Sequence, residues 1–356
     1  MAYRKIGTFV KQINEKNNDG EYTDVLGVSI EKEFMPSVAN TIGTDLRKYY
    51  VLRRNRFAFN PMHVGRDKKL PIAVYHEDEP ALVSPAYSMF EVIDNSINIK
   101  YLMLLFKTTM FDHICWFYTD GSVRGGLSWE DFCNIEIDIP SMDEQKRLVD
   151  KFNGIKNIID VKKETIIKLE ELAYMQYTKL LEDNGEINSL KLKEICKISA
   201  GGDNPGDVIE KKDDKHKIPV YSNGTKNDGL FGYTCKEKIK ENSVTVSARG
   251  AIGYTVYHNE PYFPIVRLIS ITPNDCIYTE YLYYVLKNNI YTENGTSQQQ
   301  VTIPYFEQMD VLIPSEEKLK VFHKNIKPIL YNIITNKKII DRLEELKCSI
   351  ILSIEK

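Results

Sequence analysis

The sequence predicts two mixed α/β (α+β) domains in tandem, each followed by a long helix, with the two helices paired as an antiparallel coiled coil of pseudo-twofold symmetry. Three observations predict this: a passage that occurs twice, an apolar stripe inside each copy, and strand-like alternation ahead of each copy. A length of 356 residues suits two or three domains. We expect a first domain (1–140), a helix (141–182), a second domain (183–314) and a C-terminal helix (315–356).

The repeated passage keeps a constant offset. Its opening "IPS" begins at Ile139 and again at Ile313, and its closing "LEEL" begins at Leu169 and again at Leu343, in both cases 174 residues later. Two unrelated amphipathic surface helices are the alternative explanation. The shared register disfavours it, because self-similarity at a fixed offset is typical of one structural unit used twice.

Apolar residues in each copy follow the 3.5-residue period of a coiled-coil seam. The candidate seam and partner-binding residues are Ile155, Ile159, Ile166, Leu169 and Leu172 in the first copy, and Ile329, Ile333, Ile340, Leu343 and Leu346 in the second. One seam position is polar in both copies, as Lys162 and Asn336, and a polar seam residue commonly fixes register. A single seam cannot bury itself, so we expect the two helices to pack on each other.

Gly154 and Pro328 occupy matching positions in the two copies. Proline is tolerated in the first turn of a helix but not in its interior. We therefore expect each passage to form a short helix (143–153 and 316–327) followed by a long one (155–182 and 328–355). Each long helix would extend roughly 40 Å.

The segments ahead of the two copies are typical of mixed domains of about 130 residues. Alternation in "CNIEIDIP", "SVTVSARG" and "VRLISITP" predicts strands. "YLMLLFK" (101–107) is similar to "YLYYVLK" (281–287), and the loop "DGSVRGG" (120–126) aligns with "NGTSQQQ" (294–300). Two divergent domains on a spacer of fixed length suit a long periodic ligand, and DNA, with a turn of about 34–36 Å, is the obvious candidate.

Basic and amide side chains cluster locally, although the net charge is only −3. Arginine can read guanine and glutamine can read adenine, lysine can neutralise phosphate, and glycine lets the backbone approach a phosphate. Lys68 and Lys69 are assigned to phosphate, and Arg124 and the three glutamines to bases. The alternatives are a solvated charged face and ordinary turns. The candidate DNA-binding residues are Arg54, Arg56, Arg66, Lys68, Lys69, Ser122, Arg124, Ser222, Asn223, Lys226, Arg249, Gln298, Gln299 and Gln300.

Several classes of protein are disfavoured by the sequence. No apolar run is long enough to cross a membrane, and no secretory leader is recognisable. The six cysteines are scattered without a CxxC, which indicates reduced thiols in a cytoplasm and no structural zinc. "FNPMH" (59–63) is only half of a methyltransferase motif, and no glycine-rich cofactor or nucleotide loop is present. We therefore expect no catalysis, metal or cofactor in this chain.

At this level the sequence resembles the specificity (S) subunits of Type I restriction–modification systems. The likeness rests on "IDIPSMDEQKRLVDKF" (137–152) and its degenerate copy "VLIPSEEKLKVFHKNI" (311–326), and on stretches similar to the family's target-recognition domains, "YVLRRNRFAFNP" and "TVSARGAIG". It covers essentially the whole chain. The second copy departs from the motif, since Lys318 and Leu319 replace Glu144 and Gln145.

The resemblance implies a non-catalytic subunit that selects an asymmetric bipartite DNA sequence, with one half-site for each recognition domain. Two modification (methyltransferase) subunits would bind around the helices and supply S-adenosylmethionine and adenine methylation. Restriction (motor-nuclease) subunits would join for cleavage. Two alternatives stay open: a specificity polypeptide or DNA-binding regulator outside such a complex, and a coiled-coil scaffold that binds protein.

Overall fold

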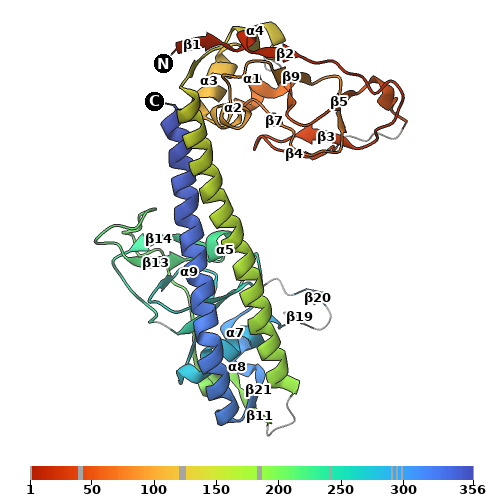
Figure 1. Ribbon diagram of the computed structural model, residues 1–356. Helices are drawn as coiled ribbons and strands as arrows, with labels where there is room; N and C mark the ends of the chain where they lie inside the picture. Colours follow the sequence, from red (N-terminus) through yellow and green to blue (C-terminus); the bar gives the residue numbers. More distant parts are fainter. Residues whose placement is uncertain are drawn as a thin grey trace. The chain divides into compact units, whose positions relative to one another are not determined.

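The computed structural model describes residues 2–38, 43–119, 126–182, 187–240, 242–289, 292–293, 296–297 and 300–355 (Figure 1). The chain forms two compact units. The first unit comprises residues 1–160 and 341–356, and the second unit comprises residues 161–340. Each unit contains one globular part and a portion of each of two long helices, α5 (Met142–Glu182) and α9 (Glu316–Ile354).

The first unit combines three small sheets with short helices. Its strands are β1 (Ala2–Lys5), β2 (Val10–Gln12), β3 (Val25–Val28), β4 (Phe34–Pro36), β5 (Tyr50–Leu52), β6 (Phe57–Phe59), β7 (Ile72–Val74), β8 (Ala81–Val83), β9 (Ser88–Val92) and β10 (Glu136–Ile139). Its shorter helices are α1 (Val64–Asp67), α2 (Ile99–Phe106), α3 (Thr109–Phe117) and α4 (Trp129–Asn134). The sheets have the orders β2-β9-β6-β7, β4-β3-β8-β5 and β1-β10.

The second unit is built in the same way. Its strands are β11 (Ile187–Lys191), β12 (Cys196–Ala200), β13 (Ile218–Tyr221), β14 (Leu230–Thr234), β15 (Ser243–Ser247), β16 (Thr255–His258), β17 (Phe263–Pro264), β18 (Leu268–Pro273), β19 (Thr292–Glu293), β20 (Thr296–Ser297) and β21 (Asp310–Pro314). Its shorter helices are α6 (Leu192–Ile195), α7 (Thr279–Lys287) and α8 (Ile303–Gln308). The main sheets have the orders β12-β18-β15-β16, β14-β13-β17 and β11-β21.

The sheet topologies of the two units correspond, except that the second sheet has four strands in the first unit, where β5 is added, and three in the second. Each four-stranded antiparallel sheet places its last strand in sequence, β9 or β18, beside its first. Each second sheet contains one parallel pair, β3-β8 or β13-β17. The strands predicted from alternating residues are present as β10, β15 and β18. The expectation of two similar mixed domains in tandem is confirmed.

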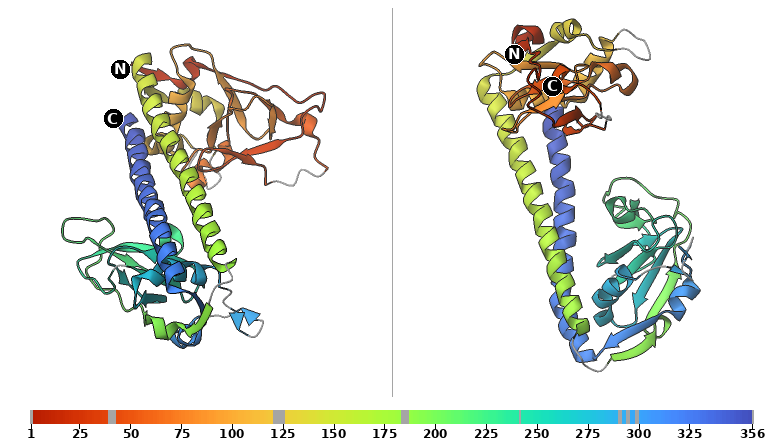
Figure 2. Two further views of the ribbon diagram at one scale, coloured as in Figure 1. Left: turned by 60° about the horizontal axis from the view of Figure 1, so that its bottom comes forward. Right: turned by 90° about the vertical axis from the view of Figure 1, so that its right-hand side faces the viewer.

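The expected interruption of the long helices is wrong. α5 and α9 run unbroken through Gly154 and Pro328, as Figure 2 shows. Gly154 costs only about 1 kcal/mol of helix propensity, and the burial of Ile159 on α5 offsets this loss. Around Pro328 on α9, the burial of Ile326 and Leu330 offsets the loss of helix propensity at the proline. With 41 residues, α5 is about 60 Å long, more than the expected 40 Å.

The buried stripes follow most of the predicted seam, with corrections at its ends. Ile159, Ile333 and the polar Asn336 are buried, while Ile155, Ile166, Leu169, Ile329, Ile340 and Leu343 are half-buried. Leu172 and Leu346 are instead 42% and 49% exposed. Beyond Leu169 the stripe continues at Ala173 and Tyr177, because steps of four follow the 3.6-residue helix rather than a strict heptad.

Parts of both long helices enter the core of each unit. In the first unit, Leu148 of α5 belongs to the core cluster, and Phe152 of α5 and Ile350 and Ile354 of α9 pack against the same cluster. In the second, a single cluster includes Tyr177 of α5 and residues from Phe322 to Ile333 of α9. The start of α5 thus belongs with the end of α9, and the end of α5 with the start of α9, an order that is antiparallel within each unit.

Candidate DNA interface

Two glycine-containing loops predicted to contact DNA lie together in the second unit. Asn223 Nδ2 donates a hydrogen bond to the Arg249 carbonyl at 2.7 Å, and Ser247 Oγ donates to the Asn223 carbonyl at 3.3 Å. The first loop closes tightly at Gly229, where a Cβ would lie 2.4 Å from the Ser222 carbonyl. Ser222, Asn223 and Arg249 are therefore brought to one edge.

Two further segments meet the same edge through backbone hydrogen bonds to Ala248. Its carbonyl accepts from the Val301 N–H at 2.9 Å, and its N–H donates to the Arg267 carbonyl at 2.9 Å. Exposed Gln300, next to Val301, thus lies near Arg249, which is also exposed. Arg267 was missed by the sequence reasoning. It is exposed at a positive φ of 70°, and its signal in the sequence is an arginine that directly precedes β18.

An ion pair fixes the loop that carries Lys226. Asp228 Oδ2 lies 2.9 Å from Lys337 Nζ on α9, and Asp228 Oδ1 accepts from the Tyr254 hydroxyl at 2.8 Å. Burial alone would raise the pKa of Asp228, but Lys337 and the hydrogen bonds outweigh it and lower that pKa. Lys226 itself is exposed, so an anchored loop presents a cation to solvent.

The first unit has the same backbone arrangement with different side chains. The Leu127 N–H donates to the Pro61 carbonyl at 3.1 Å, and Leu127 corresponds to Val301 at the 174-residue offset. Met62, 57% exposed, therefore takes the place of Arg249, and Gly126 takes that of Gln300. A Cβ at Gly126 would lie 3.3 Å from the Pro61 carbonyl, which favours glycine there.

The basic residues of this edge lie in a longer β6–β7 connection. Residues 60–71 join these strands, whereas 248–254 join β15 and β16. Arg66 Nε is 2.7 Å from Asp67, Lys68 Nζ is 4.7 Å from the centre of the Trp116 ring, and Lys69 is exposed. Arg66, Lys68 and Lys69 therefore lie on one segment, the β6–β7 connection, which is longer than its counterpart in the second unit.

Arg54 and Arg56 do not join this edge, because they precede β6 and lie at its opposite end. Arg56 Nη1 bonds to Glu15 at 2.5 Å and to the Val51 carbonyl at 2.9 Å, and its side chain is only 15% exposed. Hydrogen bonds from Arg53 and Arg56 lower the pKa of Glu15. Arg54 donates to the His76 carbonyl at 2.9 Å. These contacts correct the grouping of both arginines with the basic loop.

Ser122, Arg124, Gln298 and Gln299 lie outside the described residues, so their assignments stay predictions. Among the residues that are described, no group of three or more His, Cys, Asp or Glu side chains could hold a metal ion. Within the same ranges, no helix is long and apolar enough to cross a membrane.

Comparison with known proteins matches both units. The Type I restriction modification DNA specificity domain matches residues 7–171 and again residues 184–345. A putative type I specificity subunit of Mycoplasma pneumoniae is 29% identical over 266 residues, which cover 72% of this chain and 71% of that protein. A second one from the same organism is 31% identical over 171 residues, 48% of this chain and 51% of that protein.

One solved structure shares the fold across almost the whole chain. The crystal structure of a Type-I restriction-modification system S subunit from M. genitalium superposes with a TM-score of 0.67. The match covers 99% of this chain and 95% of that one, at 13% sequence identity.

Proposed function

This chain belongs to the Type I restriction-modification DNA specificity family, and we propose that each of its two units reads one half of an asymmetric bipartite DNA target. As a specificity subunit it has a DNA sequence-recognition role and is not itself catalytic. The observation that carries the proposal is the paired edge: the Leu127–Pro61 and Val301–Ala248 hydrogen bonds match, while Met62 and Gly126 replace Arg249 and Gln300.

The two units have the same backbone arrangement at this edge but different side chains, which suits two half-sites of different sequence. Arg249, Arg267 and Gln300 supply base-reading groups to the second half-site, since arginine pairs with guanine and glutamine with adenine. In the first unit, Arg66, Lys68 and Lys69 supply cations for phosphate or guanine. Ser222, Asn223 and Lys226 contact sugar or phosphate beside Arg249.

The proposal extends to the partners. Two modification subunits bind around α5 and α9, supply S-adenosylmethionine and methylate adenine, and restriction subunits join for cleavage; the chain itself carries no cofactor. Exposed apolar residues on α5 support partner binding: Val161, Ile167 and Met175 are 62%, 56% and 63% exposed. The place of action is the cytoplasm, where DNA and these partners meet.

The experiment starts from the methylome of cells with and without this gene, which yields the target sequence. The affinity of the assembled complex is then measured for a panel of singly substituted sites at two salt concentrations. Arg249→Ala and Gln300→Ala should relax one half-site only, by about 1–3 kcal/mol at the affected position. Lys69→Ala should weaken all sites alike and lower the salt slope by about one unit.

Arg66→Ala should weaken binding, because Arg66 supplies a cation to the first half-site, and Arg47→Ala is its matched control, because each arginine is exposed and paired with a nearby aspartate. Arg47 lies outside both edges, so its loss should change neither half-site. If Arg249→Ala weakens every site equally, Arg249 contacts phosphate and the base-reading assignment is wrong. If no methyltransferase partner is recovered in a pull-down with this chain, a regulator outside such a complex is favoured. If the assembled complex does not bind DNA, a protein-binding scaffold is favoured.

A further inference from the structure

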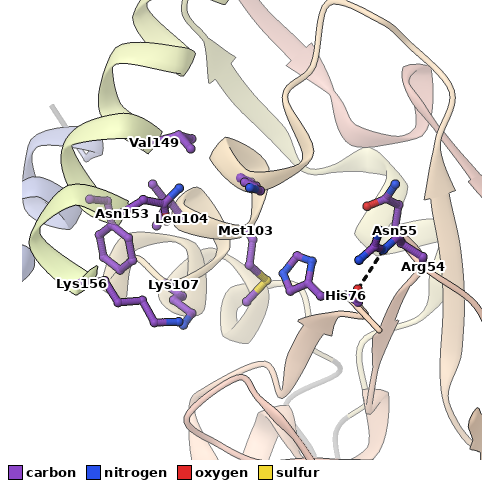
Figure 3. Close-up of a pocket in the computed structure, with 11 residues that line it drawn as sticks. Arg54, Asn55, His76, Met103, Leu104, Lys107, Val149, Asn153 and Lys156 are labelled. Atoms are coloured by element: carbon purple, nitrogen blue, oxygen red, sulfur yellow. Dashed lines mark hydrogen bonds between the residues drawn. The ribbon is translucent and has the colours of Figure 1, made fainter. Parts of the chain in front are cut away.

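A cationic pocket lies in the first unit, apart from the candidate DNA edge. It has a volume of about 560 Å³ and is bounded by α2, the start of α5 and the turns that hold Arg54 and His76 (Figure 3). Four cations line it, Arg54, Lys100, Lys107 and Lys156, together with apolar side chains that include Met103 and Phe152. None of the described side chains that line it is a carboxylate.

The positive charge of this pocket is poorly compensated. Two of the cations have acidic partners: Glu33 lies 3.9 Å from Lys107 and Asp78 lies 3.1 Å from Arg54, and these carboxylate side chains are 74% and 80% exposed. Burial lowers the pKa of Lys107. Burial and the charges of Lys100, Lys156 and Arg54 lower the pKa of His76 and outweigh the opposing charge of Glu77. A concave site with a positive field favours an anion.

The pocket and the candidate DNA edge lie at opposite ends of the same strand. β6 runs from Phe57 to Phe59, so Arg54 precedes the strand and the basic loop 60–71 follows it. β7 is antiparallel to β6, so His76, which follows β7, lies at the Arg54 end. The pocket is therefore separated from the loop 60–71 by the length of β6, about 10 Å, and duplex DNA is a competing ligand that the test must include.

The matching positions of the second unit form a filled interior. Lys100 corresponds to Glu280 at the 180-residue offset, and Val149 and Lys156 correspond to His323 and Leu330 at the 174-residue offset. Glu280 is fully buried and bonds to the Tyr257 hydroxyl at 3.0 Å and to His323 Nδ1 at 2.6 Å. Leu330 is buried. Lys107, in contrast, corresponds to Lys287 at the same 180-residue offset, so Lys100 and Lys156 are the pocket cations that the second unit replaces.

We propose that this pocket binds a phosphorylated small molecule of nucleotide size. Lys100, Lys107 and Lys156 neutralise its phosphates, and Met103 and Phe152 pack against its ring. The volume falls in the range of small-molecule sites, about 300–1,000 Å³. The apolar floor favours a ligand with a flat ring over bare phosphate. This inference does not depend on the proposed recognition of DNA.

The test is calorimetric titration of the full chain with ATP, GTP and inorganic tripolyphosphate, without divalent cations. One nucleotide should bind per chain, and tripolyphosphate should bind at least about tenfold more weakly because it lacks the ring. Lys156→Gln and Lys107→Gln should each weaken nucleotide binding by about tenfold. Lys151→Gln is the matched control, since Lys151 is exposed on the same helix but does not line the pocket.

Four results would overturn the proposal: no binding of either nucleotide at millimolar concentration, binding unchanged in Lys156→Gln, equal affinity for tripolyphosphate, or a preference for a glutamate-rich peptide or duplex DNA. Lys156 is exposed, so its neutralisation leaves the fold intact. The site-panel affinities of the assembled complex should be the same with Lys156→Gln as without it. The nucleotide titration therefore tests the pocket, the site-panel affinities test DNA recognition, and either proposal can be wrong without the other.

Discussion

The two units share a strand order but stabilise it with different interiors. The first unit packs phenylalanines, with the rings of Phe57 and Phe90 stacked at 4.9 Å, and buries a salt bridge in which Lys32 Nζ lies 2.7 Å from Asp112. The second unit packs tyrosines around fully buried Glu280, which bonds to the Tyr257 hydroxyl. A tyrosine in a core requires a partner for its hydroxyl, so the second core is a hydrogen-bonded network.

The repeat therefore constrains the backbone more than it constrains the chemistry of the interior. The strand order of the four-stranded antiparallel sheet and the Leu127–Pro61 and Val301–Ala248 hydrogen bonds are common to both units. The buried polar groups and the exposed edge residues differ between the two units. A scaffold of this kind can change the sequence that it reads without changing its fold, because the edge side chains are not part of either core.

The largest expected effect concerns the salt bridge found in the first unit. Asp112→Ala leaves the Lys32 ammonium buried and removes the acceptor of the Leu70 N–H. The loss should be about 3–5 kcal/mol of unfolding free energy. Both tryptophans of the chain, Trp116 and Trp129, lie in the first unit, so tryptophan fluorescence during denaturation reports that unit.

The control for this salt bridge is the double variant Lys32→Met, Asp112→Asn. It removes both charges, and the asparagine Oδ1 can still accept from Leu70. The double variant should recover much of the stability that Asp112→Ala loses, since a buried charge without a partner is the main penalty. Equal losses in the two variants would show that the charge is hydrated and not buried.

A second prediction exchanges the residues that differ at the start of the long helices. Gln145 is buried and its side chain accepts from the Asn98 N–H at 2.7 Å and donates to the Ser96 and Pro140 carbonyls, both at 2.9 Å. Leu319, its counterpart, is buried among apolar residues. Gln145→Leu and Leu319→Gln should each cost about 1–3 kcal/mol, because each leaves buried polar groups without partners.

Native-state hydrogen exchange resolved by peptide measures the two changes separately. Gln145→Leu should speed exchange in α2 and β9, and Leu319→Gln in α7 and β21. Gln145→Glu is a useful control, since it keeps the acceptor for Asn98 but cannot donate to Ser96 and Pro140. If Gln145→Leu is neutral, the motif glutamine serves a partner and not the fold.

Much of the fold could be predicted because it follows from periodicity. The alternation that predicted β10, β15 and β18 and the stripe through Ile159 and Ile333 reflect burial on one face, which a sequence displays directly. The break expected at Pro328 was wrong because tertiary burial of Ile326 and Leu330 overrides a local preference. The periodicity of a sequence does not show whether tertiary burial will outweigh a local preference against helix.

The candidate DNA edge could be predicted only in part. Ser222, Asn223 and Arg249 were proposed because glycine and polar residues mark loops, but their proximity depends on the Asn223–Arg249 hydrogen bond. The pairing of Arg56 could not be foreseen, because its partner, Glu15, lies 41 residues away. Arg267 was missed because its position at the edge is set by a hydrogen bond to Ala248 that no local pattern encodes.

A third prediction concerns acid sensitivity in the second unit. His258 is buried, its Nε2 lies 2.8 Å from Thr245 Oγ1, and burial lowers its pKa to about 3 despite the opposing charge of Asp228. The unfolded histidine has a pKa of about 6.5. Below that pH the unfolded state binds a proton that the folded state excludes, so stability is present above pH 6.5 and falls as the pH drops toward 3.

The expected loss is about 1.4 kcal/mol between pH 7.5 and pH 5.5, from this one group. Hydrogen exchange of β15 and β18, corrected for the intrinsic effect of pH, measures it. His258→Gln removes the titration while keeping a polar group near Thr245, and should flatten the pH dependence. An unchanged slope in that variant would assign the acid sensitivity to other groups.

The smallest expected effect is at Gly154, the residue that matches Pro328. A Cβ there meets no atom within 4 Å, and the residue lies inside a continuous helix. Gly154→Ala should therefore raise the stability of the first unit by about 0.5–1 kcal/mol, because alanine loses less backbone entropy than glycine in a helix. The midpoint of tryptophan-reported denaturation measures the gain. Lys151→Ala, on the same helix, should change it by less. A loss of stability in Gly154→Ala would mean that the first helix bends at this glycine, and the likeness between the two long helices would then end at this position.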